Sequence, residues 1–238
     1  AVESLVLGHV PTMAASWASQ YARWRAEASG KPVAVVRLGD GRARVEIFNS
    51  ALGPAGPTPA IDLSASIQLA RRLVHHVIVL PAPGSAADCD ALVARAGGVT
   101  LLTTPDEAGL VAAYGSLKRL APVCEPGAPG GGKPLRIVAV GATAAKAQPA
   151  CRRLQDAAAS FLRVDTEASV CIERLGGGHA PVTLFDGPWI TTVDELMDEV
   201  TGAIVLVRPA NAAAAARAGD GGLSPLASAL PAFSTASA

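Results

Sequence analysis

The sequence predicts one α/β domain with a mostly parallel central sheet and helices on both faces, in three layers. Short apolar segments without polar alternation are separated by segments of helical periodicity, a pattern typical of strands buried on both faces. The chain has 238 residues, a usual size for one such domain, and 50% of them are hydrophobic. Aromatic residues make up only 4%, and the abundant alanine favours close packing of helices on the sheet.

The predicted strands are apolar runs bounded by glycine, proline or charged residues. The first is the run SLVLGHV, and a later pair flanks Asp40 and Gly41, which together are typical of a hairpin turn. The third strand alternates apolar and polar residues, so we expect it to return antiparallel or at an edge. We expect strands over residues 4–10, 31–38, 42–48, 74–80, 99–103, 135–140, 168–172, 182–185 and 203–207.

The predicted helices lie between these strands and carry recognisable start signals. Thr12 is a suitable N-cap for the first helix, Asp62 or Ser64 for the second, and Thr104 for the one that begins at Pro105. Aromatic residues recur on one face of the first helix, which indicates core packing. We expect helices over residues 13–28, 61–73, 85–96, 105–120, 144–161 and 193–200.

The last part of the chain has a different composition. We expect the α/β domain to cover residues 1–208 and an Ala/Gly/Ser/Pro-rich tail, residues 209–238, to be disordered. The tail has one basic residue, Arg217, so the basic amphipathic helix of a membrane anchor is not expected. No apolar run reaches the length of a membrane span, and a soluble cytoplasmic protein is the expectation.

Charge and cysteine content exclude several classes of partner and cofactor. The formal net charge is +0 and the pI about 7.1, so we expect no general affinity for nucleic acid. Four cysteines, Cys89, Cys124, Cys151 and Cys171, lie at least 20 residues apart without a close pair. This spacing is unlike a zinc site or a disulfide framework, and it predicts buried thiols in a reducing compartment.

Two stretches resemble the MinD, ParA and FlhG-like branch of the P-loop NTPases. VTLLTTPDEAGLVAAYGSLKRLA, residues 99–121, resembles the family's strand, T-T/P-P-E turn and following helix. LRIVAVGATAAKAQPACRRLQDAAASFL, residues 135–162, resembles the next strand and the long helix of FlhG-like members. The resemblance covers roughly residues 4–172 and implies a P-loop NTPase-like fold that acts through protein partners or as a homodimer.

The chain departs from this family at the positions that hold a triphosphate. The family's first loop ends G-K-T or G-K-S, whereas residues 8–16 here contain no lysine, and Pro11 removes a backbone N–H donor. The carboxylate of the family's D-x-P-A-G loop is replaced by Val79, and the base-contacting asparagine falls at Gly141. These departures imply loss of ATP hydrolysis, with no catalytic residues and no cofactor expected; ATP binding is not supported.

Residues 127–133 also satisfy the pattern G-x-x-x-x-G-K, which is typical of phosphate-binding loops. Pro134 follows instead of serine or threonine, and the segment comes after a helix and before a strand. Because a phosphate loop follows a strand and opens a helix, we do not expect this segment to bind phosphate.

Two functions therefore stand as hypotheses. The first is a non-hydrolysing MinD/FlhG-like regulatory or scaffolding protein, either complete or part of a longer scaffold. The second is a small-ligand-binding or enzymatic α/β domain that uses the loop after the first strand. Ligands of such sheets bind beyond the carboxyl ends of the strands. The candidate ligand-binding residues there are Gly8, His9, Thr12, Ser16 and Asp40, although Asp40 is explained equally well by the hairpin turn.

Overall fold

A computed structural model describes most of the first 202 residues. The described residues are 1–8, 14–39, 41–48, 62–82, 86–128, 132–174, 180–189 and 191–202, all within a compact unit that spans Ala1–Ile204. Two expectations, the strand over residues 203–207 and the tail over residues 209–238, lie outside the described residues.

The described strands and helices follow one another in the predicted order. The strands are β1 (Val2–Leu7), β2 (Val33–Gly39), β3 (Arg42–Phe48), β4 (His76–Leu80), β5 (Val99–Thr103), β6 (Leu135–Val140), β7 (Val170–Ile172) and β8 (Val182–Pro188). The helices are α1 (Ala14–Ser29), α2 (Leu63–Leu73), α3 (Ala86–Arg95), α4 (Glu107–Cys124), α5 (Ala144–Ala157), the π-helical turn η1 (Ala158–Leu162) and α6 (Val193–Thr201).

The strands form an eight-stranded sheet in the order β7-β6-β5-β1-β4-β2-β3-β8. The six strands from β7 to β2 in this order run parallel, whereas β3 runs antiparallel to both β2 and β8. The predicted mostly parallel α/β sheet is therefore confirmed, and so is the hairpin return of β3. Strand β1 lies inside the sheet, between β4 and β5, so later strands of the chain lie on both sides of it.

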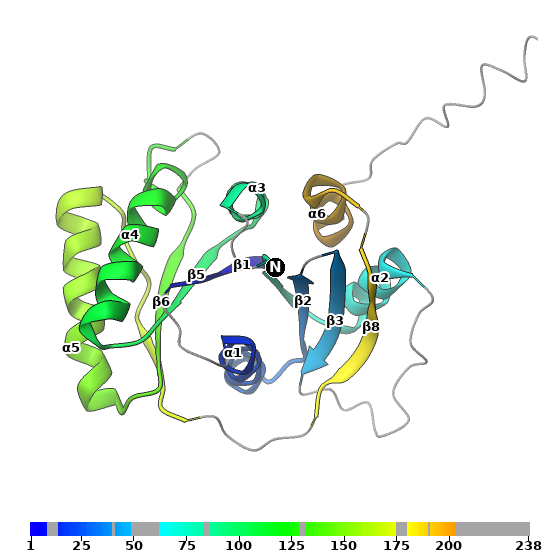
Figure 1. Cartoon of the computed structure of the whole chain (residues 1–238), viewed down its shortest axis with the longest axis horizontal. Coiled ribbons are helices and arrows are strands. Elements are labelled where there is room, and N and C mark those ends of the chain that lie inside the picture. Colours follow the sequence, from blue (N-terminus) through cyan, green and yellow to red (C-terminus); the bar gives the residue numbers. More distant parts are fainter. Residues whose placement is uncertain are drawn as a thin grey trace, which may run out of the picture. The chain divides into compact units, whose positions relative to one another are not determined.

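Helices cover both faces of the sheet (Figure 1). Helix α1 packs on one face, where Tyr21 and Ala22 contact alternate strand residues such as Leu5 and Val138. The other helices pack on the opposite face, with α2 and α6 over one half of the sheet and α3, α4 and α5 over the other. Because neighbouring residues of a strand point to opposite faces, Leu5 and Val6 belong to different cores.

Several predicted boundaries were wrong by a few residues. Strand β1 begins at Val2 and ends at Leu7, so it includes Glu3. The N-cap of α4 is Asp106 rather than Thr104, because the Asp106 carboxylate accepts a 2.8 Å hydrogen bond from the Gly109 N–H. Thr104 is buried at the end of β5 instead. Helix α4 continues to Cys124, with Pro122 inside its last turn.

The second half of the chain also differs in detail. The predicted long helix ends at Ala157 and continues as the π-helical turn η1, after which Arg163 adopts a left-handed conformation. Strand β8 lies beside β3, more than 130 residues earlier in the chain. All four cysteines are free thiols; Cys171 is half-buried and the others are buried. Among the described helices, none is long and apolar enough to cross a membrane.

Candidate functional site

The predicted site residues that the structure describes are Gly8 and Ser16. Gly8 follows β1, where its N–H donates a 2.8 Å hydrogen bond to the Leu102 carbonyl of β5. A Cβ atom at this position would lie 3.0 Å from the same oxygen, so the close approach of the two strands favours glycine. Ser16 lies half-buried in the first turn of α1. His9, Thr12 and Asp40 lie outside the described residues, and their roles stay predictions.

Four parallel strands of the sheet, β1, β4, β5 and β6, have no charged residue directly after their carboxyl ends, whereas Asp40, which lies outside the described residues, follows β2. The uncharged residues are Gly8 after β1, Pro81 after β4, Thr104 after β5 and Gly141 after β6. A bound nucleoside triphosphate with its Mg²⁺ needs cations beside the phosphates and oxygen ligands for the metal. Within the described ranges, these four positions supply neither a lysine nor a carboxylate.

Trp17, in the first turn of α1, packs beside Gly141 at the same edge. A Cβ atom at residue 141 would lie 3.5 Å from Cζ2 of the Trp17 ring. Gly141 itself has a φ of +79°, a left-handed conformation that favours glycine. A Cβ atom at this distance would make an ordinary van der Waals contact, so the indole borders the position where the resemblance would have an asparagine.

Lys133, the last residue of the second phosphate-loop pattern, has a structural role. Its ammonium group donates hydrogen bonds of 2.6 and 2.5 Å to the carbonyls of Ala94 and Ala96, at the carboxyl end of α3. A cation at this end satisfies carbonyls that the helix leaves without partners. Although residues 129–131 lie outside the described part, the contacts of Lys133 agree with the prediction that this pattern does not bind phosphate.

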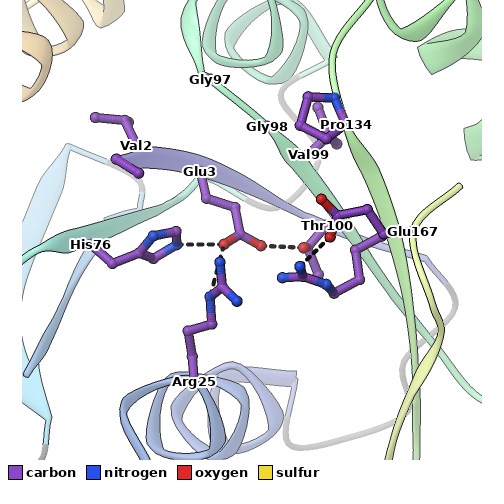
Figure 2. A pocket seen from close by; sticks show the side chains of 12 residues that line it. Val2, Glu3, Arg25, His76, Gly97, Gly98, Val99, Thr100, Pro134 and Glu167 are labelled. Atoms are coloured by element: carbon purple, nitrogen blue, oxygen red, sulfur yellow. Dashed lines mark hydrogen bonds and ion pairs between the residues drawn. The ribbon is translucent and has the colours of Figure 1, made fainter. Parts of the chain in front are cut away.

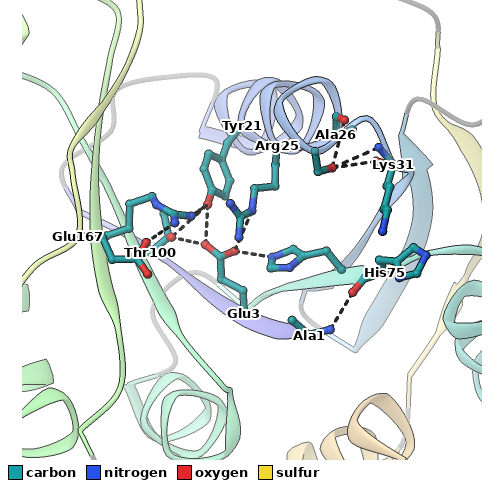
Figure 3. A network of polar contacts seen from close by, with 12 residues as sticks. Ala1, Glu3, Tyr21, Arg25, Ala26, Lys31, His75, Thr100 and Glu167 are labelled. Carbon is teal, nitrogen blue, oxygen red and sulfur yellow. Dashed lines mark hydrogen bonds and ion pairs between the residues drawn. The ribbon is translucent and has the colours of Figure 1, made fainter. Parts of the chain in front are cut away.

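A buried polar network lies at the opposite edge, near the amino ends of β1, β4, β5 and β6 (Figure 3). Its centre is Glu3 of β1, which is 4% exposed. One carboxylate oxygen accepts hydrogen bonds from the Tyr21 hydroxyl, at 2.6 Å, and from Thr100. The other lies 2.5 Å from Nε2 of His76 and 3.9 Å from Nε of Arg25.

The network continues outward through a second arginine. Arg136 of β6 donates a 3.3 Å hydrogen bond to the Tyr21 hydroxyl and forms an ion pair with Glu167. Tyr21 and Arg25 both extend from α1 toward Glu3, as Figure 3 shows. The network therefore ties α1 to the sheet through side chains from four parallel strands.

These contacts determine the charge state of the central groups. Burial by itself would raise the pKa of Glu3, but hydrogen bonds from His76, Thr100 and Tyr21 outweigh it and lower the pKa to about 2. Burial and the nearby Glu3 charge raise the pKa of Tyr21 above its ordinary value. At neutral pH the carboxylate is ionised and the phenol is protonated.

A small pocket opens beside this network (Figure 2). Its volume is about 200 Å³, and its walls include Arg25, His76, Arg136 and the Gly97–Gly98 turn. Known ligand pockets are usually larger and lie at the carboxyl edge of such sheets. Because the oxygens of Glu3 are already bonded to donors of the protein, this carboxylate is poorly placed to act as a general base. We interpret the network as a structural clamp between α1 and the sheet.

The lowered pKa of Glu3 predicts a specific loss of stability in acid. A group with a depressed folded-state pKa stabilises the fold above its unfolded pKa, here 4.5, and this contribution is lost as the pH falls toward about 2. Urea unfolding across this window should therefore show a falling free energy of unfolding in the wild type and a smaller fall in Glu3→Gln.

The comparison with the variant isolates Glu3 from other acids. Asp186 also has a lowered pKa, because Arg44 and Arg42 donate hydrogen bonds to it, but it contributes equally to both proteins. Equal slopes in the two proteins between pH 4.5 and pH 2 would show that Glu3 is not held ionised by the network.

An apolar groove lies between α4 and the α5–η1 segment. Its floor includes Leu110 and Leu154, both buried, and its sides carry Val111 and Phe161. Among the described residues, Val111 and Phe161 are the large hydrophobic side chains that lie exposed, by 66% and 75%. Exposed apolar side chains gathered at one groove are typical of interaction surfaces.

No protein-family model matches the chain, and a search of curated proteins also finds no match. The resemblance to MinD, ParA and FlhG-like proteins therefore rests on the two stretches quoted above and on the order of the elements. Within the described part, no group of three or more His, Cys, Asp or Glu side chains is placed to hold a metal ion.

Sequence reasoning missed the polar network. Each of its strand residues stands at the first or second position of a strand: Glu3, His76, Thr100 and Arg136. Since the amino ends of parallel strands meet at one edge, this shared position was the available signal. It was lost because the first strand was expected to begin at residue 4, which left Glu3 outside the sheet.

Proposed function

We propose that this chain is a non-hydrolysing regulatory or scaffolding domain of the MinD/ParA/FlhG kind, which acts through protein partners. The two stretches that resemble this family fold as β5–α4 and β6–α5, the strand–helix units that the resemblance implies. Their strands lie side by side and parallel in the sheet. This agreement supports the fold assignment on which the proposal depends.

The observation that carries the proposal is that, among the described residues, none of those directly after β1, β4, β5 and β6 is charged. Gly8, Pro81, Thr104 and Gly141 follow the central strands, and Trp17 packs against Gly141 where the resemblance would have a base-contacting side chain. Catalysis of phosphoryl transfer depends on cations and positioned polar groups around the phosphates. A domain with this strand and helix order but without these groups would act by binding partners rather than by phosphoryl transfer.

The groove between α4 and α5 supports the proposal that the chain acts through protein partners. A folded chain that exposes Phe161 by 75% and Val111 by 66% beside one groove has apolar surface available for a partner. The small-ligand hypothesis depends on His9, Thr12 and Asp40, which lie outside the described residues, so it stays a hypothesis.

Isothermal titration with ATP and Mg²⁺, and separately with ADP, tests the nucleotide half of the proposal. We expect no binding tighter than about 1 mM for either nucleotide. An active ATPase of the same family, titrated under the same conditions, is the positive control. Micromolar binding of ATP together with measurable turnover would overturn the proposal, because the carboxyl edge of the sheet would then be an active nucleotide-binding site.

A further inference from the structure

We propose that the pocket beside Glu3 binds a small dicarboxylate, with Arg25 and Arg136 as the groups that hold its carboxylates. The walls of this pocket include Arg25, His76, Arg136 and Glu167. It is called the amino-edge pocket below, because the amino ends of β1, β4, β5 and β6 meet there. This site is separate from the proposed function, which concerns the carboxyl edge of the sheet and protein partners.

The amino-edge pocket gathers basic side chains from three elements that lie far apart in the sequence. Arg25 comes from α1, His76 from β4 and Arg136 from β6. Figure 2 shows Arg25 and His76 directed toward the Glu3 carboxylate. The formal net charge of the whole chain is +0, so these groups are a local concentration rather than part of a general basic surface. Guanidinium groups are the side chains best suited to bind a planar carboxylate.

The negative charge of Glu3 is covered rather than presented to the amino-edge pocket. Its side chain is 6% exposed, and both of its oxygens already contact donors from α1, β4 and β5. The side chains of Arg25 and Arg136 are more accessible, at 29% and 16%. A ligand therefore meets the guanidinium groups before it meets the carboxylate, and Glu3 keeps its role as a clamp.

Arg25 has hydrogen-bonding capacity that Glu3 does not use. Its Nε atom lies 3.9 Å from a Glu3 carboxylate oxygen, an ion pair that is too long for a hydrogen bond. A guanidinium group carries five N–H donors in a planar fork that matches a carboxylate. Arg25 can therefore donate to a ligand in the pocket while it stays close to Glu3.

Arg136 already binds a carboxylate at the pocket wall, that of Glu167. The Glu167 side chain is 42% exposed, and exposed ion pairs contribute little to stability. Its backbone is held separately, because its N–H donates a 2.8 Å hydrogen bond to Leu135 and its carbonyl accepts a 3.1 Å bond from Gln155. The Glu167 side chain can therefore turn away without moving the backbone, and a ligand carboxylate can take its place on Arg136.

The size of the amino-edge pocket restricts the ligand to a small ion. Its volume is about 200 Å³, which corresponds to roughly seven water molecules at ~30 Å³ each. Drug-sized ligands occupy larger pockets, of about 300 Å³ or more. A dicarboxylate with a short carbon chain is of the right size, and it offers one carboxylate to each arginine.

Titration of the full chain with malonate, at pH 7 and constant ionic strength, tests the proposal. We expect saturable binding with a Kd below about 1 mM. Arg25→Gln should weaken this binding by about 10-fold or more, because it removes a charged donor to the ligand. Inorganic phosphate, titrated in the same way, should bind more weakly than malonate, since it offers a single tetrahedral group.

Glu167→Gln should change the affinity in the opposite direction. It removes the carboxylate that competes for Arg136, so we expect malonate to bind about threefold more tightly. A purely structural role of the arginines would not produce this gain. The variant also tests the proposal if Arg25→Gln does not fold, which urea unfolding of each protein would reveal.

Arg72→Gln is the matched control for Arg25→Gln. It removes the same charge at an exposed position at the end of α2, outside the amino-edge pocket. We expect its affinity for malonate to equal that of the wild type. A loss as large as in Arg25→Gln would mean that malonate responds to the net charge of the chain rather than to this pocket.

Three results would overturn the proposal. The first is a wild-type chain that shows no saturable binding of malonate up to about 10 mM, and the second is binding that neither Arg25→Gln nor Glu167→Gln alters. The third is phosphate binding tighter than malonate binding, which would assign the pocket to a different anion. None of these results bears on the proposed function, which is decided by nucleotide binding and turnover.

Discussion

Glu3→Gln should lower the free energy of unfolding by about 3 kcal/mol at neutral pH, because it removes a buried charge from partners arranged around it. Tyr21, Thr100 and His76 all contact the carboxylate, and Arg25 lies 3.9 Å away. Glutamine keeps the size of the side chain, so the loss reports charge and hydrogen bonding rather than a cavity. Urea unfolding at constant m-value is the measurement.

Glu167→Gln is the control for this change. Glu167 belongs to the same network, through its ion pair with Arg136, but its side chain is 42% exposed. Exposed ion pairs contribute little, so we expect a loss of at most about 1 kcal/mol. If the two variants lose the same stability, the buried centre of the network is not special, and the interpretation of Glu3 as a clamp fails.

Gly109→Ala should destabilise the domain by about 2 kcal/mol. A Cβ atom at Gly109, near the start of α4, would lie well inside contact distance of the Thr104 hydroxyl and carbonyl oxygens at the end of β5. One of these atoms belongs to the backbone, so the clash is relieved only by shifting the helix or the strand. The gain in helix propensity, about 1 kcal/mol, offsets part of the cost.

Gly115→Ala provides the matched comparison in the same helix. A Cβ atom at Gly115 meets nothing within 4 Å, and the residue is exposed. The same substitution should therefore raise the free energy of unfolding by up to about 1 kcal/mol. Thermal unfolding of both variants beside the wild type measures the difference. A Gly109→Ala protein as stable as Gly115→Ala would show that α4 does not approach β5 as closely as described.

The local elements were largely predictable because their signals are local. Strands β5 and β6 were predicted at their observed bounds, since each is an apolar run between glycine, proline or polar residues. The cap of α2 at Asp62 was among the predicted alternatives, and its carboxylate accepts a 2.7 Å hydrogen bond from Ala65 N–H. The predicted N-cap of α4 was wrong because both Thr104 and Asp106 are suitable capping residues. Thr104 is buried at the end of β5, and Asp106 caps the helix instead.

Long-range features could not be predicted in the same way. The position of β8 beside β3 depends on pairing between segments more than 130 residues apart, and no local pattern encodes such a partner. The network around Glu3 similarly joins one helix and four strands. Of the candidate ligand-binding residues, Gly8 is explained by its contact with β5, whereas His9, Thr12 and Asp40 are predictions still to be tested.

We propose that this α/β domain has the strand and helix order of the family it resembles but does not hydrolyse a nucleoside triphosphate. Phosphate release from ATP and Mg²⁺, measured with the full chain over several hours, tests it most directly. The uncharged strand ends at Gly8, Pro81, Thr104 and Gly141 predict release no faster than in a protein-free control. Release that rises in proportion to protein concentration and saturates with ATP would contradict the claim.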